Sequence, residues 1–445
     1  MKKARRAAII VGSISATAAL MVAGLPARAA DVDAPDWQIV ATVHYGAGGN
    51  ASGYSAVVAL GKTDAWAFGG TNPGGTSTPA AEHWNGQHWR SSALPAGLSG
   101  FIVAAAASSH RSVWAVGDGY VLHWNGAKWS VAKAWSQPGQ LTSVAAINRD
   151  DVWVFGSSTL SGEASLGAWH FNGRAWIRAP GLANRIYRAS AFARHDIWAI
   201  TASPQGGWVA HYNGRAWKRV VSADAALANT QLEDVVAVSR TSVWVSGISP
   251  VSGQNGRLVL AHWDGARWKR FVAPWGVQLT ERFAPDGAGG IWIPVVTSGT
   301  DSATWILHLS RAGRWNRIKI AASRATGVGI GDLALIPGTT ALWGSGGLLN
   351  TKGGDATIWA HLVVAARAPV PDIDNARPAG SMSGAAIIRA HAVGDSVSAP
   401  VPVPAPAPWV HQVKDGDQAS WGHPSGRRPA ERSPDRLSRV RGYPK

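Results

Sequence analysis

Seven histidines recur at one position of a short repeated motif, and imidazole is a common metal ligand and proton carrier. The motif reads HWNGQHW at residues 83–89, and related copies follow at residues 123, 170, 211 and 262. The set is His83, His123, His170, His211, His262, His308 and His361. One histidine per repeat spreads the set around the molecule, whereas a metal ion needs its ligands within about 2 Å. We therefore predict a structural role, no metal site and no cofactor.

Acidic side chains offer no evident catalytic pair. Most glycoside hydrolases use two carboxylates that face each other across the scissile bond. Glu163, Asp224 and Asp301 are scattered over separate segments. Cys is absent, which excludes disulfide bonds and thiolate metal sites. The question of an enzyme stays open, with the balance against one.

A cationic set is the first candidate for binding. Nearly every repeat has Lys or Arg in a predicted turn at one end of its strands, which we call the basic-turn face. The set is Lys62, Arg111, Lys128, Arg149, Arg174, Arg194, Arg215, Arg240, Arg267, Arg311 and Arg314, and it is interrupted by Asp64, Asp150, Asp151, Asp196 and Asp286. Such a face could bind teichoic acid, acidic polysaccharide or nucleic acid. The simpler interpretation is a set of ordinary solvated turns.

Two tryptophans outside the repeat register are the second candidate. Trp135 and Trp275 are expected on the opposite face, which we call the long-loop face. Its loops are rich in Ser, Thr, Asn and Gly, at residues 71–79, 157–165, 249–256, 297–303 and 347–354. Neutral polar loops with an exposed indole suit sugar or peptide binding. Alternatively, these rings only fill the ends of the repeats.

The element that must position all of these residues is a repeat anchored by Trp. The anchors are Trp66, Trp114, Trp153, Trp198, Trp244, Trp292 and Trp343, which lie 39 to 51 residues apart. Each copy holds up to four strand-like runs, and Asn-Gly or Asp-Gly usually links the last two. Seven copies of this length predict an all-β, seven-bladed β-propeller of four-stranded antiparallel blades.

The seventh copy is incomplete, and its missing strand lies at the other end of the propeller. Residues 358–369, IWAHLVVAARAP, have no turn and no final Trp. The segment DWQIVATV at 36–43 has the form of an outermost strand, with Trp37 in the place of the missing Trp. We predict that residues 36–43 pair with the last three strands and close the ring.

The repeat resembles the kelch repeat and the galactose-oxidase-type propeller. The copy DAWAFGG…AAEHWNGQHWRSSALP (64–95) carries the family's glycine pair as Gly69 and Gly70. The resemblance covers residues 36 to about 364 and is degenerate in most copies. It implies a propeller fold. The copper site of galactose oxidase needs a Cys-linked Tyr, and this chain has no Cys, so the resemblance implies no such chemistry.

Composition divides the chain of 445 residues into three parts. Residues 1–29 read as a secretory signal peptide with cleavage after Ala29, the alternative being a retained anchor. The propeller spans 36–364, and 365–445 form a Pro/Ala-rich linker and a basic disordered tail. Blades are expected near 54–93, 101–133, 141–179, 186–221, 232–273, 279–320 and 329–363 plus 36–43.

These features favour a secreted, non-catalytic binding propeller. Its expected partner is an extracellular polysaccharide or protein, with an anionic polymer as a further option on the basic-turn face. After signal cleavage we expect a monomer without a transmembrane anchor. The alternatives are a carbohydrate-active enzyme (lyase or hydrolase) with a site on the central axis, and a structural or adhesive envelope protein. Acids, Tyr and His gathered on the axis at the long-loop face would favour the enzyme.

Overall fold

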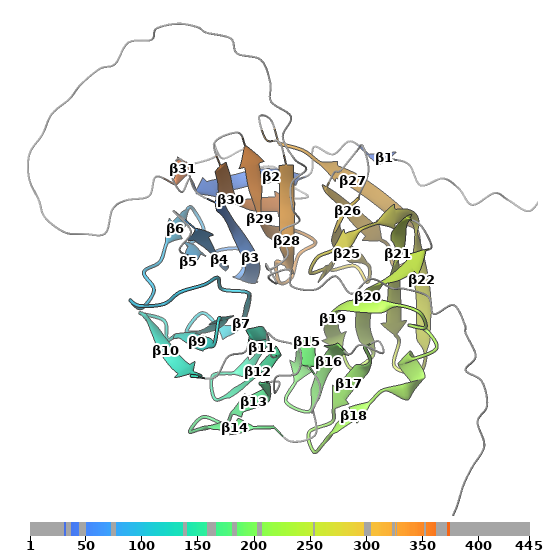
Figure 1. Ribbon diagram of the computed structural model, residues 1–445, viewed down its shortest axis with the longest axis horizontal. Coiled ribbons are helices and arrows are strands. Elements are labelled where there is room, and N and C mark those ends of the chain that lie inside the picture. The colour runs from blue at the N-terminus through green and yellow to red at the C-terminus, as the bar shows by residue number, and fades with distance from the viewer. Residues whose placement is uncertain are drawn as a thin grey trace, which may run out of the picture. The chain divides into compact units, whose positions relative to one another are not determined.

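Seven β-sheets form a ring around one axis in the computed structural model (Figure 1). It describes residues 31–32, 37–43, 50–72, 77–136, 140–157, 166–179, 185–202, 207–251, 254–297, 304–322, 325, 327–350, 353–361 and 372–373. The predicted signal peptide, nearly all of the linker, the tail and parts of the long loops lie outside these residues. The predicted seven-bladed propeller of four-stranded antiparallel blades is confirmed.

Blades 1 to 4 follow the chain, each running from the innermost to the outermost strand. Blade 1 holds β3 (Asn50–Gly61), β4 (Asp64–Asn72), β5 (Thr78–Trp84) and β6 (Trp89–Ser91). Blade 2 holds β7 (Ala104–Ser109), β8 (Ser112–Gly117), β9 (Tyr120–Trp124) and β10 (Trp129–Ala134). Blade 3 holds β11 (Gln140–Asn148), β12 (Asp151–Ser157), β13 (Gly167–Phe171) and β14 (Trp176–Arg178). Blade 4 holds β15 (Arg185–Ala193), β16 (Asp196–Ala202), β17 (Val209–Tyr212) and β18 (Trp217–Arg219).

The last three blades vary this plan. Blade 5 has β19 (Gln231–Ser239), β20 (Ser242–Val251), β21 (Gln254–Trp263) and β22 (Trp268–Val277). Blade 6 has a divided innermost strand, β23 (Leu279–Thr280) and β24 (Ala284–Pro285), then β25 (Ile291–Val296), β26 (Thr304–Leu309) and β27 (Trp315–Ile320), with β1 (Asp31–Val32) beside β27. Blade 7 has β28 (Gly327–Leu335), β29 (Leu342–Asn350), β30 (Gly353–His361) and β2 (Trp37–Val43), with β31 (Asp372–Ile373) beside β2.

The ring closes as predicted, because β2 pairs antiparallel with β30. Trp37 lies opposite His361 and Val43 opposite Ala356. Three strands of the last blade therefore come from one end of the propeller and the fourth from the other (Figure 1). Trp37 is only 7% exposed and meets Trp292 of blade 6 edge-on, with ring centroids 6.3 Å apart.

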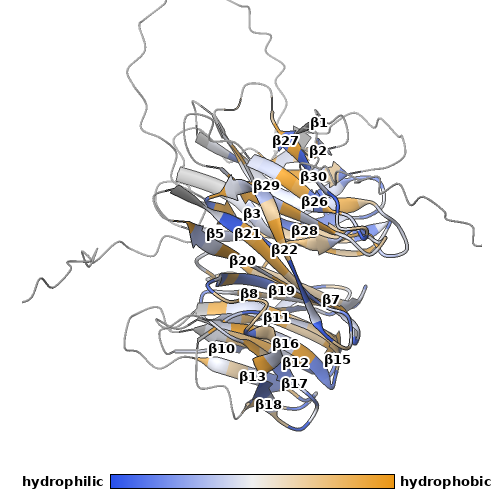
Figure 2. Ribbon diagram, turned by 90° about the vertical axis from the view of Figure 1, so that its right-hand side faces the viewer, coloured by the Kyte–Doolittle hydropathy of each residue, from blue (hydrophilic) through white to orange (hydrophobic). Residues whose placement is uncertain are grey.

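Tryptophans fill the wedge between neighbouring blades. The anchor Trp of one blade meets the first Trp of the outermost strand of the next blade in an edge-to-face contact. The centroid separations are 5.2 Å for Trp66–Trp129, 6.0 Å for Trp153–Trp217, 5.9 Å for Trp198–Trp268 and 5.3 Å for Trp343–Trp89. Aromatic pairs favour this geometry. Figure 2 shows the result, with hydrophobic residues spread over the blades rather than gathered in one centre.

The innermost strands share an irregularity that determines which side chains reach the axis. Their register with the second strand shifts at one equivalent place, between Leu141 and Ser143, Ile186 and Arg188, Leu232 and Asp234, and Ile330 and Asp332. A bulge of this kind leaves one residue unpaired and re-aims the neighbouring side chains. In blade 6 the same place is the gap between β23 and β24.

Candidate functional site

The repeat histidines have structural contacts in the described blades. In six blades the imidazole stacks on the anchor Trp, with centroids 3.9 to 4.4 Å apart. Nε2 lies 2.8 to 2.9 Å from an Asp carboxylate in the pairs His83–Asp64, His170–Asp151, His211–Asp196 and His308–Asp286. Among the described residues no three His, Cys, Asp or Glu are grouped to hold a metal ion. These contacts support the structural role predicted for the motif.

Four acids that we expected to interrupt the basic-turn face are buried instead. Asp64, Asp151, Asp196 and Asp286 are 9%, 1%, 7% and 7% exposed. Burial acts to raise the pKa of Asp151, but hydrogen bonds from His170 and Arg194 outweigh it and lower that pKa. These carboxylates therefore belong to the framework. Of the acids predicted to dilute the face, only Asp150 remains on its surface.

The cationic set is exposed on one face of the ring, as the predicted turns require. Every member lies in a turn between the first two or the last two strands of a blade, and these turns share one end of the antiparallel sheets. Arg149, Arg194 and Arg267 have carboxylate neighbours at 3.6, 2.6 and 3.7 Å. Lys62, Arg111, Lys128, Arg174, Arg215, Arg240, Arg311 and Arg314 have no carboxylate within salt-bridge distance among the described residues.

The two out-of-register tryptophans are engaged in packing. Trp135 lies in the core between blades 2 and 3, with its ring centroid 5.6 Å from that of Trp169. Trp275 lies on the long outermost strand of blade 5, and the Arg317 guanidinium lies 4.9 Å from its ring centroid. Both indoles remain partly exposed. The geometry therefore agrees with the alternative that these rings fill the ends of the blades, and sugar binding by them stays a prediction.

A charged cluster on the axis was not among the predicted sites. The bulge positions of blades 4, 5 and 6 present Tyr187, Glu233 and Glu281, and the next positions present Arg188, Asp234 and Arg282. Blade 7 adds Asp332. The sequence did contain a signal, because charged residues interrupt these innermost runs, as in EDVVAV (233–238) and GDLALI (331–336).

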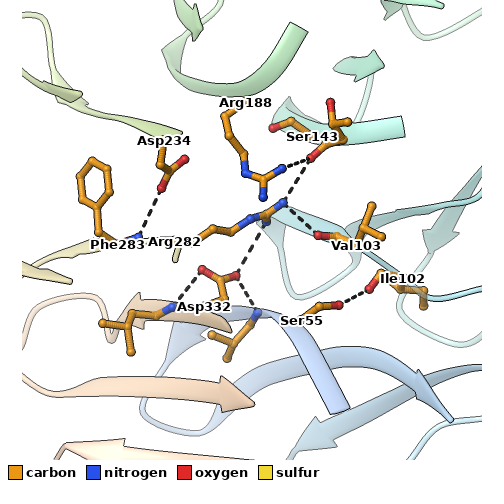
Figure 3. A network of polar contacts seen from close by, with 12 residues as sticks. Ser55, Ile102, Val103, Ser143, Arg188, Asp234, Arg282, Phe283 and Asp332 are labelled. Atoms are coloured by element: carbon orange, nitrogen blue, oxygen red, sulfur yellow. Dashed lines mark hydrogen bonds and ion pairs between the residues drawn. The ribbon is translucent and has the colours of Figure 1, made fainter. Parts of the chain in front are cut away.

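Arg282 connects opposite sides of the ring (Figure 3). Its Nη2 donates to the carbonyl oxygens of Val103 in blade 2 at 2.9 Å and Thr142 in blade 3 at 3.2 Å. Its Nη1 lies 3.9 Å from Oδ2 of Asp332 in blade 7. That oxygen accepts a hydrogen bond from the backbone N–H of Val57 in blade 1 at 3.0 Å. The Arg282 side chain is 14% exposed.

The remaining two blades join the same network. Arg188 of blade 4 donates to the Thr142 carbonyl at 3.4 Å. Asp234 of blade 5 accepts from the Phe283 N–H of blade 6 at 3.3 Å. All seven blades therefore meet through polar contacts at the axis, with Arg282 at their centre (Figure 3). We call Arg188, Asp234, Arg282 and Asp332 the axial network.

Burial raises the pKa of the carboxyl groups around the axis. The value for Glu281 rises to about 8, against the opposing charges of Arg188 and Arg282. Glu233 rises to about 7 and Asp332 to about 6, again because burial disfavours the charged form. Each of these acids therefore holds its proton to a higher pH than an exposed carboxyl does.

Replacement of Glu281 by Gln is expected to flatten the pH dependence of stability. The folded pKa of about 8 lies above the unfolded value of about 4.3, so the native state keeps a proton that the unfolded chain has lost. Stability therefore falls as pH rises from about 4.3 to 8. Thermal unfolding from pH 5 to 9 should show that the Glu281→Gln variant loses less stability with rising pH than the wild type does. The exposed Asp150→Asn should keep the wild-type slope, and an unchanged slope in Glu281→Gln would refute the assignment.

Comparison with known proteins supports the fold. No protein-family model and no curated protein matches the chain. The solved structure "YCF48 bound to D1 peptide" is similar to it with a TM-score of 0.52 and 12% identity, over 76% of this chain and 100% of that one. A GH74 xyloglucanase from Xanthomonas campestris is similar with a TM-score of 0.50 and 16% identity, over 75% of this chain and 55% of that one. At these identities the likeness shows a shared β-propeller fold alone.

Proposed function

We propose that this protein is an exported, non-catalytic binding propeller whose basic-turn face binds an anionic glycopolymer of the cell envelope. The observation that carries the proposal is the charge balance of that face. Eight of its cations have no carboxylate partner among the described residues, while Asp64, Asp151, Asp196 and Asp286 are withdrawn into the blades. A face on which exposed cations outnumber exposed acids attracts and concentrates an oppositely charged polymer.

The expected export of the protein favours an envelope polymer over nucleic acid as the ligand. The expected signal peptide at residues 1–29 would place the propeller outside the cytoplasm, where acidic polysaccharides and teichoic acids are more accessible than nucleic acid. No helix in the described residues is long and apolar enough to cross a membrane. We also propose that the repeat is of the kelch type, on the basis of the glycine pair Gly69 and Gly70.

A carbohydrate-active enzyme remains the second candidate, because one observation favours it. Tyr187, Glu233 and Glu281 come together at the ends of the innermost strands nearest the long-loop face. Two carboxyl groups with raised pKa values beside a Tyr could supply a general acid. No repeat His joins this group, because the stacked imidazoles lie against the anchor tryptophans. Turnover of a bound polymer would favour this candidate over pure binding.

Binding of the chain from residue 30 to a polyuronate, a poly(glycerol phosphate) and neutral dextran tests the proposal. The two polyanions should bind and the dextran should not, and affinity should fall steeply with salt. Removal of three neighbouring turn cations, Arg174, Arg215 and Arg240, by substitution with Ala should weaken binding roughly tenfold.

A matched triple variant removes equal charge elsewhere. Arg90, Lys218 and Lys269 each lie opposite the repeat His on an outermost strand. Their replacement by Ala should change the affinity by less than about threefold. Equal losses in the two triple variants, or binding that does not respond to salt, would overturn the assignment to the turns. Tighter binding of single-stranded DNA than of either glycopolymer would redirect it to nucleic acid.

A further inference from the structure

A shallow groove of about 520 Å³ opens between blades 4 and 5. Its wall on the blade 5 side is the hairpin HWDGARW, which contributes Trp263, Ala266, Arg267 and Trp268. Because Arg267 lies in the turn of this hairpin, one end of the groove reaches the basic-turn face. The volume falls within the roughly 300–1,000 Å³ typical of small-ligand sites.

The opposite wall of the groove is an insertion in the connection between blades 4 and 5. After β18 the chain forms a short 3-10 helix, η2 (Val221–Ala223), before it enters blade 5. Ala223 and Leu227 are buried in the core between the blades and fix the insertion, while Ala225 stays exposed. Arg270 of blade 5 donates to the carbonyl oxygen of Ala226 at 2.6 Å. The two walls are therefore held together before any ligand arrives.

The groove combines an apolar lining with one exposed cationic group. Trp263 and Trp268 are partly exposed, with ring centroids 5.7 Å apart, and Ala225 and Ala226 of the insertion also line the groove. The Arg267 side chain is 85% exposed, and its carboxylate neighbour among the described residues is the exposed Asp264 at 3.7 Å. An indole covers the apolar face of a sugar ring, and a guanidinium binds a carboxylate or phosphate oxygen. Arg270 already donates a hydrogen bond to the backbone carbonyl of Ala226.

We propose that this groove is a subsite that holds one anionic sugar unit, with the ring against Trp263 and its carboxylate or phosphate on Arg267. The subsite rests on the proposed function, because it would fix one unit of a polymer that the whole basic-turn face attracts. The basic-turn face supplies a long-range attraction that depends only on charge. The groove supplies a short-range contact that depends on where the sugar unit sits.

Two alanines at equivalent positions give a matched test. Ala266 lines the groove, and Ala127 occupies the same place in the blade 2 hairpin HWNGAKW. Both are exposed, and both donate their backbone N–H to the Asx side chain of the turn at 2.9 Å. Ala266→Glu and Ala127→Glu therefore add the same charge to the same face in the same local structure. The probes are a trimeric uronate and a trimer of hexose units linked by phosphodiesters, measured by calorimetry with the chain from residue 30.

Ala266→Glu should weaken binding of at least one trimer about tenfold or more, since a repelled anionic group loses a charge-assisted hydrogen bond. Ala127→Glu should change it less than about twofold. Loss with the uronate alone or with the phosphate alone identifies the anionic group. Trp263→Ala should lower the affinity as well, against Trp124→Ala as its matched control, with thermal unfolding to verify the folded state.

Failure of the subsite differs from failure of the proposed function. If both Glu variants weaken the trimer equally while long polyanions still bind in a salt-dependent way, the groove is not a subsite and the face still binds. If the wild type binds neither polyanion, the proposed function itself is wrong. Binding of neutral trisaccharides as tightly as acidic ones would overturn the role of Arg267.

Discussion

A chain that lacks residues 31–43 is expected to unfold at a temperature lower by roughly 10 °C or more than the chain that starts at residue 30. The deletion removes the outermost strand of blade 7, and with it the buried side chains of Trp37, Ala41 and Val43. It leaves the edge of β30 unpaired, and an exposed edge invites association between chains. Differential scanning calorimetry measures the midpoint, and light scattering measures the association.

A strand supplied in trans separates loss of closure from general damage. A synthetic peptide of residues 36–43 should raise the midpoint of the truncated chain, because it can pair with β30 and place Trp37 against Trp292. The same peptide with Ala in place of Trp37 should restore less. If the truncated chain keeps the midpoint of the longer one, residues 36–43 do not hold the ring closed.

Arg282→Met is expected to lower the free energy of unfolding by about 3 kcal/mol, the largest loss among single substitutions at the axis. The Arg282 side chain is 14% exposed, and its guanidinium contacts blades 2, 3 and 7. Met matches its length but removes the guanidinium donor from the carbonyl oxygens of Val103 and Thr142, although Arg188 still donates to the Thr142 oxygen. It also leaves Asp332 without its cationic neighbour. Urea denaturation at pH 7 measures the loss.

Two further variants test whether the axial network is the cause. Arg240→Met removes an exposed turn cation and should change stability by less than about 0.5 kcal/mol. Asp332→Asn combined with Arg282→Met should cost less than the sum of the single changes, because the two side chains interact directly. Additive losses would show that Arg282 acts independently of Asp332.

Local pattern was sufficient to predict the propeller. Each blade is built from neighbours in sequence, so the anchor Trp, the Asn-Gly hairpin and the final Trp recur at a regular period. Even the closure followed from that period, because the copy without a final Trp pointed to Trp37. The bulge of the innermost strands was not predicted, since the charged residues that interrupt these runs do not by themselves show that one residue is left unpaired.

The sequence by itself therefore determined the blades, their number and the way the ring closes. Only the tertiary structure decided which charges reach solvent and which meet at the axis. Asp151 and Arg149 lie two residues apart, and the sequence predicts both as exposed turn residues. In the structure Asp151 is buried, because its carboxylate pairs with the stacked His170, whereas Arg149 stays exposed. Arg282 and Val103 lie 179 residues apart and meet because the ring returns on itself. Charge contacts of this kind depend on distances between blades, and no periodicity within one blade encodes them.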